Sequence, residues 1–570
     1  MSPFVRIAAV RHGDRICAQS TLLILLGLLT LTFSGLSESR EAELDFQTTR
    51  SLAQWRSGDL EGTPEAVRLL ADEEYLWQPS PGQFRSPRPL GGPIASIPLY
   101  WAGVLLQTGL EGLEERHASS GSAQQSEYVA HLVVGWKNSL LAAITAWLVV
   151  LSSRRIGVGR KHAWLSGLVF ILCTFVWPQA RGSSIEIQVG FFLFLAFHLL
   201  LRARERFERL RRPRRTDLAF IGISLGMTFL TRPQIWPSIM ILTIATVTAI
   251  FAGYRGLAKH ALFLRQTWRF GHWVDSLWVM LPLLFAIALT AVANQARSGS
   301  IIGLPGELFA VASTSPISDF ALSLIAPGRG LIWLAPLVLL APFGLLGGVR
   351  QSALLWPTCV VLVSFPILWV SKAPLGEDEL WGFGPGRLLP AMPFLWLGVA
   401  LAIDRFSRVA WKRRLTYVLC VLGVITNLSG VLIDTSTYQD LVGKAVLAKA
   451  AETEESERAE TELYRVAHWT PGLAEPWASW RILRHRLAGQ GEEFPVDQIF
   501  LQGDRSNGEP QLTRRVVSPE GERRRSFRHV AWIDLRDRLL TPLYPGVLIS
   551  LLLVAAGCIF AVRGLDRALP

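Results

Sequence analysis

The feature that most constrains the fold is a succession of apolar runs, each about as long as a helix that crosses a bilayer. The runs fall at residues 20–36, 128–152, 163–178, 184–203, 217–232, 235–253, 274–294, 329–347, 353–371, 386–404, 415–434 and 543–563. Half of all residues are hydrophobic and only 18% are charged, whereas about a quarter of the residues in soluble domains are charged. The sequence therefore predicts an all-α membrane protein of about 12 transmembrane helices with extracytoplasmic loops.

Basic residues between the runs indicate how these helices are oriented. Lys and Arg number 57 against 45 Asp and Glu, but they are spread over alternate short loops instead of forming one patch, so no nucleic-acid partner is expected. These basic loops lie at 154–161, 202–215, 255–269, 350 and 405–414. The positive-inside rule places them in the cytoplasm, and both termini with them.

The same topology divides the chain into three parts. Residues 1–434 form a transmembrane core, whose first outer loop (38–127) contains a short apolar segment at 89–106. Pro93 and Pro98 interrupt that segment, so it predicts a short surface helix, not a span. Residues 435–542 form an extracytoplasmic soluble segment, and residues 543–570 are the last transmembrane helix with a cytoplasmic C-terminus.

Neither a metal nor a nucleotide site has a sequence signature. The five cysteines form no C-x-x-C pair, so no zinc site or disulfide framework is expected. His131 and His198 lie in apolar runs without a second ligand at helical spacing. No glycine pattern of a nucleotide-binding loop is present.

Ionisable and polar residues gather near the predicted outer ends of the helices, where charged side chains without a function are costly. The acidic members follow the first run. The full set is Glu41, Glu43, Asp45, Arg181, Glu186, Arg232, Asn294, Arg297, Arg329 and Arg387. A carboxylate near several guanidinium groups suits a reaction in which a hydroxyl loses a proton and an anionic phosphate leaves. A single such arginine is also compatible with an interfacial anchor that binds no ligand.

Several of these residues lie in segments that resemble a known superfamily. The segments are 46–53 (FQTTRSLA), 97–103 (IPLYWAG), 174–181 (TFVWPQAR) with Glu186, 230–233 (LTRP), 294–299 (NQARSG), 326–333 (APGRGLIW) and 381–393 (WGFGPGRLLPAMP). Their order, over residues 20 to 435, resembles that of GT-C membrane glycosyltransferases. The most similar members are bacterial protein O-mannosyltransferase-like and lipid A aminoarabinose transferase-like proteins.

This resemblance implies a GT-C-like fold and a hexosyl- or pentosyltransferase in the inner membrane of a bacterium. Its partners would be the bilayer, a polyprenyl-phosphate-sugar donor, and a lipid, glycan or protein acceptor. Transfer would take place on the outer face with inversion at the anomeric carbon.

The resemblance also assigns roles to residues. Glu41 aligns with the acidic base of the first outer loop, with Glu43 and Asp45 as near alternatives. Arg181, Arg232, Arg329 and Arg387 would bind the donor phosphate, and Asn294 and Arg297 would support them. Glu186 is either a second acid or the ion-pair partner of Arg181.

At the aligned position these enzymes usually have Asp as part of an Asp-Glu pair, whereas here Arg40 precedes Glu41. The cofactor is therefore left open, with a divalent metal as an alternative. Two other functions also stay open. One is a flippase of a lipid-linked sugar, although the two halves show no repeat of the kind many transporters have. The other is an inactive GT-C-like scaffold.

Overall fold

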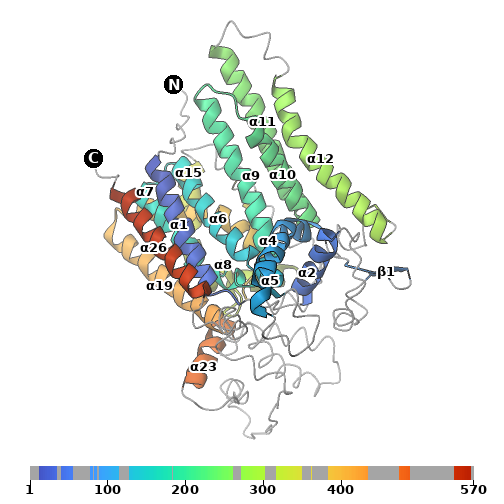
Figure 1. Cartoon of the computed structure of the whole chain (residues 1–570). Coiled ribbons are helices and arrows are strands. Elements are labelled where there is room, and N and C mark those ends of the chain that lie inside the picture. The colour runs from blue at the N-terminus through green and yellow to red at the C-terminus, as the bar shows by residue number, and fades with distance from the viewer. Residues whose placement is uncertain are drawn as a thin grey trace.

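The computed structural model describes residues 12–34, 40–54, 77–80, 83–86, 89–114, 128–182, 184–260, 271–298, 300–301, 316–349, 358, 361–362, 383–433, 474–487 and 545–566. These residues are almost entirely helical (Figure 1). The helices of the first half are α1 (His12–Leu31), α2 (Arg40–Ala53), α4 (Gly91–Glu114), α5 (Tyr128–Gly135), α6 (Lys137–Arg155), α7 (Arg160–Leu172), α8 (Val176–Gln179), α9 (Ile185–Glu208), α10 (Arg215–Thr231), the 3-10 helix η2 (Pro233–Ile235), α11 (Trp236–His260) and α12 (Gly271–Ser298). The second half contributes α13 (Pro316–Ile325), α14 (Leu331–Leu334), η4 (Pro336–Leu340), α15 (Ala341–Val349), η5 (Gly386–Ala391), α18 (Met392–Phe406), α19 (Ala410–Leu432), α23 (Glu475–Leu487) and α26 (Pro545–Asp566). Strands β1 (Trp77–Ser80) and β2 (Gln83–Arg85) form an antiparallel hairpin.

Eight helical segments in the described part of the chain are long and apolar enough to cross a membrane. They comprise His12–Leu31, Val129–Arg155, Ile185–Glu208, Pro233–Arg255, Gly271–Ala296, Gly386–Phe406, Ala410–Leu432 and Val547–Gly564. Each coincides with a predicted run, and the all-α membrane class is confirmed. Three further runs fall on the shorter helices α7, α10 and η4 with α15, and the run at 353–371 lies almost wholly outside the described residues. The count of about twelve therefore stays a prediction.

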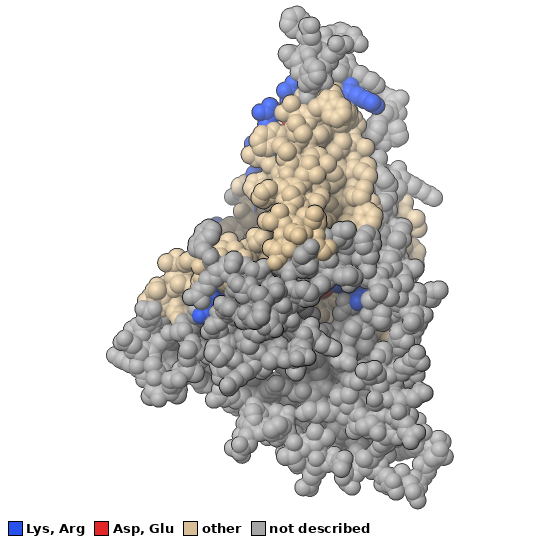
Figure 2. Space-filling model, turned by 90° about the vertical axis from the view of Figure 1, so that its right-hand side faces the viewer, with Lys and Arg blue, Asp and Glu red and all other residues tan. Residues whose placement is uncertain are grey.

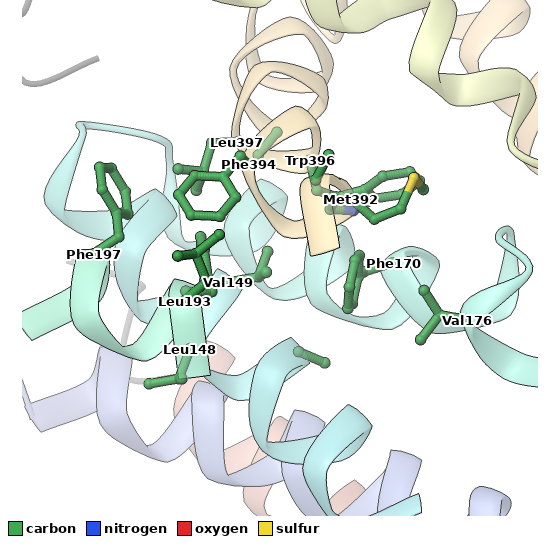
Figure 3. Packing of buried hydrophobic residues seen from close by; sticks show 14 of the residues in the cluster. Leu148, Val149, Phe170, Val176, Leu193, Phe197, Met392, Phe394, Trp396 and Leu397 are labelled. Atoms are coloured by element: carbon green, nitrogen blue, oxygen red, sulfur yellow. The ribbon is translucent and has the colours of Figure 1, made fainter. Parts of the chain in front are cut away.

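The core of the bundle lies where α6, α7, α9 and α18 meet (Figure 3). The apolar part of the span Gly386–Phe406, which contains α18, is 83% buried, whereas that of the α12 span is 22% buried. Helix α18 is therefore central and α12 peripheral. Phe170 and Trp396 pack edge to face with ring centroids 5.7 Å apart, and the indole of Trp396 donates to the Ser166 carbonyl at 2.7 Å. Phe194 packs edge to face on Phe394 at 5.3 Å. A helix that is apolar on all sides, as α18 is, is stable when other apolar helices enclose it.

The first and last helices form an antiparallel pair with closely approaching backbones. A Cβ at Gly27 would lie 2.6 Å from the Ser550 carbonyl oxygen, and one at Gly557 would lie 2.9 Å from the Ile24 nitrogen. Small residues at a helix contact allow this approach in membranes. The pair brings the N-terminal end of α1 and the C-terminal end of α26 to the same end of the bundle (Figure 1).

A charged network closes that end. The Asp14 carboxylate is fully buried and accepts hydrogen bonds from Arg154 at 3.0 Å and Arg160 at 2.8 Å. Arg160 also donates to the Gly564 carbonyl at 3.5 Å. The ends of α1, α6, α7 and α26 are therefore fixed to one another, on the side where the sequence predicts the cytoplasm.

The peripheral helices present an apolar surface. Trp273, Leu281 and Phe285 of α12 are 59%, 59% and 70% exposed. Figure 2 shows a broad area of uncharged side chains on this side of the molecule, with Lys and Arg at its upper end. Such a band bounded by basic residues is typical of a surface that faces lipid.

The opposite end of the bundle carries α2, α4 and α23 (Figure 1). Helix α4 begins at Gly91 and continues to Glu114, beyond the predicted limits of 89–106. Pro93 lies in its first turn, where a helix has no hydrogen-bond acceptor for the missing N–H group, and Pro98 is accommodated inside the helix. Of the predicted segment 435–542, the described helix α23 packs against α19, where Ile433, Ile482 and Leu483 are buried together.

Candidate functional site

Three acidic residues of the predicted first outer loop were candidate bases, and Asp45 is the one whose side chain the structure describes. It lies on α2 and is only 7% exposed. Glu41 and Glu43 belong to the same helix, but their side chains lie outside the described part of the chain. Residues four apart share a helix face, so Glu41 stands one turn from Asp45 on that face, and Glu43 does not.

The first turn of α4 lies directly against Asp45. A Cβ at Gly92 would lie 3.1 Å from Asp45 Oδ2 and 3.7 Å from Gln188 Oε1, so Gly92 allows α4 to approach both side chains. The hydroxyl of Thr49 donates to the carbonyl of Asp45 at 2.6 Å and lies 3.5 Å from that of Pro93. These contacts hold α2 and the start of α4 together.

Lys137 is a residue of this site that the sequence analysis missed. It opens α6, is 5% exposed, and donates to the Ser96 hydroxyl at 2.5 Å and the Gly92 carbonyl at 3.5 Å. The Gly92 position therefore adjoins both Lys137 and the Asp45 carboxylate. A lysine interrupting the apolar run at 128–152 was the available signal, because an ionisable residue within a predicted span indicates a function.

Glu186 and Arg232 form an ion pair beside the same turn of α4. Arg232 donates to Glu186 Oε1, and the Ser184 hydroxyl donates to Oε2 at 3.1 Å. A Cβ at Gly91 would collide with Thr231, the residue before Arg232, so the start of α4 lies against the end of α10. The alternative in which Glu186 pairs with Arg181 is wrong, because helix α10 packs on α9 and brings Arg232 to the carboxylate instead.

Arg181 instead connects helix ends through the main chain. Its Nε donates to the Thr32 carbonyl at 2.7 Å and its Nη1 to the Gly430 carbonyl at 3.2 Å. The Ser34 hydroxyl donates to the carbonyl of Arg181 at 3.0 Å. Arg181 therefore fastens the C-terminal ends of α1 and α19 to the loop before α9, and at least two of its N–H groups are engaged there.

The other predicted residues lie on separate elements. Arg387 belongs to η5, which packs on α9 near Gly190, the end of α9 that carries Glu186. Arg329 is 2% exposed in the turn between α13 and α14. Asn294 is buried on α12, and Arg297 is on the same helix, with its side chain outside the described residues.

The structure therefore brings Asp45, Glu186 and Arg232 to the start of α4, together with Lys137 and Gln188. Within the described ranges, no three His, Cys, Asp or Glu residues are grouped so that they could hold a metal ion. Among the described residues this group combines the carboxylates of Asp45 and Glu186 with the cations Lys137 and Arg232, and Glu186 and Arg232 form an ion pair.

Comparison with known proteins gives one family match. Residues 115–295 match the family model of dolichyl-phosphate-mannose-protein mannosyltransferases. This range includes Lys137, Arg181, Glu186, Gln188 and Arg232 and does not include Asp45. A search of curated protein sequences gives no match.

Solved structures with some similarity include ArnT from Cupriavidus metallidurans. In its apo state the match has 14% identity and a TM-score of 0.39 and covers 95% of this chain and 75% of ArnT. The match to ArnT with undecaprenyl phosphate bound has 14% identity and a TM-score of 0.38 and covers 83% of this chain and 77% of ArnT. The match to archaeal oligosaccharyltransferase AglB from Archaeoglobus fulgidus, in complex with an inhibitory peptide and a dolichol-phosphate, has 11% identity and a TM-score of 0.39. It covers 78% of this chain and 59% of AglB.

TM-scores below 0.5 transfer no residue roles to this chain. The family match itself rests on sequence and spans α5 to most of α12. Within residues 115–295 the chain is similar to the dolichyl-phosphate-mannose-protein mannosyltransferases, and its resemblance to the GT-C membrane glycosyltransferases is confirmed.

Proposed function

We propose that this protein is a membrane glycosyltransferase that moves a sugar from a polyprenyl-phosphate donor to an acceptor hydroxyl on the outer face of the membrane. The observation that carries the proposal is the buried carboxylate of Asp45 at Gly92, whose carbonyl accepts from Lys137. Helix α2, which carries Asp45, lies toward the end of the bundle opposite the N-terminus of α1 (Figure 1). The family match on residues 115–295 supports the reaction class.

In this proposal Asp45 is the general base. A neighbouring ammonium group favours the ionised carboxylate, so Lys137 keeps Asp45 ready to accept the proton of the acceptor hydroxyl. The acceptor oxygen attacks the anomeric carbon as the bond from that carbon to the phosphate oxygen breaks, which inverts the configuration. Polyprenyl phosphate leaves with the electron pair of that bond.

Arg232 would stabilise the departing phosphate. A guanidinium group has five N–H donors in a planar fork, so Arg232 can hold Glu186 and still donate to a phosphate oxygen. Arg387, Arg329 and Arg181 remain further candidates, with Asn294 and Arg297 as supporting residues. Glu41, one turn from Asp45, is the alternative base.

Two measurements test the reaction class. Cells carrying the wild-type gene or a deletion are compared by glycan and glycolipid profiling, and a sugar missing only in the deletion identifies the product. The purified protein is then incubated with the donor and acceptor that the profile indicates. Release of sugar-free polyprenyl phosphate is expected only when both are present. Unchanged profiles together with lipid-linked sugar accumulating on one membrane face would favour a flippase.

Two adjacent glycines give a prediction about the site. Gly92→Ala is expected to lower the turnover number about tenfold with the fold intact, because its Cβ would press on the Asp45 carboxylate. Gly91→Ala is expected to destabilise the protein by about 2 kcal/mol, because its Cβ would collide with the backbone of Thr231. Transfer rates and thermal unfolding in detergent are measured for both.

The control for these variants is Gly386→Ala, because a Cβ there meets no atom within 4 Å. It should change neither quantity. If Gly92→Ala keeps the wild-type turnover, Asp45 is not positioned by α4 for catalysis.

A further inference from the structure

Gln188 is buried without the contacts that normally justify burying an amide. It lies in the first turn of α9 and is 0% exposed. Both Nε2 and Oε1 lack a hydrogen-bond partner within the described residues. An unpaired buried amide costs about 1–3 kcal/mol, so such a group in a native core requires an explanation.

Two other buried amides of this protein connect separate segments. Asn427 on α19 donates to the carbonyl of Leu334 on α14 and to that of Gly423 within α19, both at 2.7 Å. Asn138 on α6 donates to the Gly182 carbonyl at 2.9 Å. Gln188 has no comparable bond in the part of the chain described here, so helix packing does not account for it.

The position of Gln188 points to a ligand. Its Oε1 and Asp45 Oδ2 both lie within 4 Å of where a Cβ at Gly92 would be. It is two residues from Glu186, the carboxylate that holds Arg232. Gln188 therefore lies close to the proposed base, in the same first turn of α9 as the residue that holds the proposed phosphate-binding arginine.

We infer that the Gln188 amide binds hydroxyl groups of the donor's sugar. In a direct displacement the sugar lies between the base and the departing phosphate, so a side chain close to Asp45 and in the same helix turn as Glu186 is near the sugar. An amide offers one acceptor and two N–H donors, which matches a pair of neighbouring hydroxyls. This inference rests on the proposed function.

The test compares lipids that differ only in the presence and identity of the sugar. Binding of sugar-free undecaprenyl phosphate and of undecaprenyl phosphate bearing mannose, glucose or galactose is measured on the full-length protein in detergent, without acceptor. Gln188→Leu is expected to weaken binding of the preferred sugar lipid about tenfold, the loss of one or two hydrogen bonds. It should leave the affinity for sugar-free undecaprenyl phosphate unchanged.

Gln188→Leu should also fold, since it removes a buried amide that has no partner among the described residues, and its thermal unfolding temperature should equal or exceed that of the wild type. The matched control is Gln107→Leu on α4, where another buried amide oxygen lacks a partner in the described residues, well away from Asp45. Gln188→Asn is a second, smaller change that keeps the amide group.

The outcomes separate the two proposals. Equal weakening for both kinds of lipid, or no weakening at all, would overturn the role of Gln188 in sugar binding while the wild type still binds a sugar lipid. A wild-type protein that prefers none of the sugar lipids to sugar-free undecaprenyl phosphate would contradict the proposed function, and the inference about Gln188 with it. A loss in Gln107→Leu as large as in Gln188→Leu would assign the effect to core packing.

Discussion

Asp45→Asn is expected to lower the rate of sugar transfer by about 10²- to 10⁴-fold, the usual contribution of a general base. Asn has nearly the shape of Asp and cannot accept the proton. The substitution also keeps the hydrogen bond from the Thr49 hydroxyl to the main-chain carbonyl of residue 45, and the side chain still fits against Gly92 at the start of α4. Initial rates of polyprenyl-phosphate release by purified protein measure the effect, and the donor KM should change little.

Two variants make this prediction specific. Asp404→Asn is the matched control, since Asp404 hydrogen-bonds His162 on the far end of the bundle and is partly exposed. It should keep the wild-type rate. Glu41→Gln should have a much smaller effect than Asp45→Asn. If Glu41→Gln abolishes transfer and Asp45→Asn does not, the base is Glu41, the residue that the resemblance to GT-C glycosyltransferases places at the position of the acidic base.

Much of the fold follows from the sequence because lipid leaves the backbone few solutions. The apolar runs that the structure describes are mostly helical, since a spanning segment must satisfy its own N–H and C=O groups. The limits of α4 were harder to predict. Pro93 and Pro98 look like helix breakers in the sequence, and only the observed start at Gly91 shows that Pro93 is in a permitted position.

The site was only partly predictable, because a sequence does not show which helices are neighbours. The Glu186–Arg232 contact joins residues 46 positions apart, and it depends on α10 lying beside α9. Arg181 has the same sequence appearance as a phosphate ligand, yet its guanidinium donates to carbonyls of two distant helix ends. Gln188 carries no charge, and nothing in the sequence distinguishes it from a helix-packing amide.

The Glu186–Arg232 pair gives the second large expected effect. Its side chains are only 20% and 14% exposed. Removing one member of such a pair takes away an ion-pair contact that compensates the other charge, which costs about 3 kcal/mol. Glu186→Gln and Arg232→Gln are therefore each expected to lower the free energy of unfolding by about this amount, measured by denaturation in mixed detergent. The double variant should recover most of the loss, because both charges of the pair are then removed together.

The same three proteins decide what Glu186 does. If it only holds Arg232, transfer by Glu186→Gln should fall modestly, with the main change in donor KM, and the double variant should resemble Arg232→Gln. If Glu186 is a second acid, kcat should fall in Glu186→Gln with little change in donor KM, and the double variant should be slower than Arg232→Gln, even though the double variant is stable. Stability losses that simply add in the double variant would show that the two side chains do not stabilise each other, and Arg232 would then be held in place by other contacts.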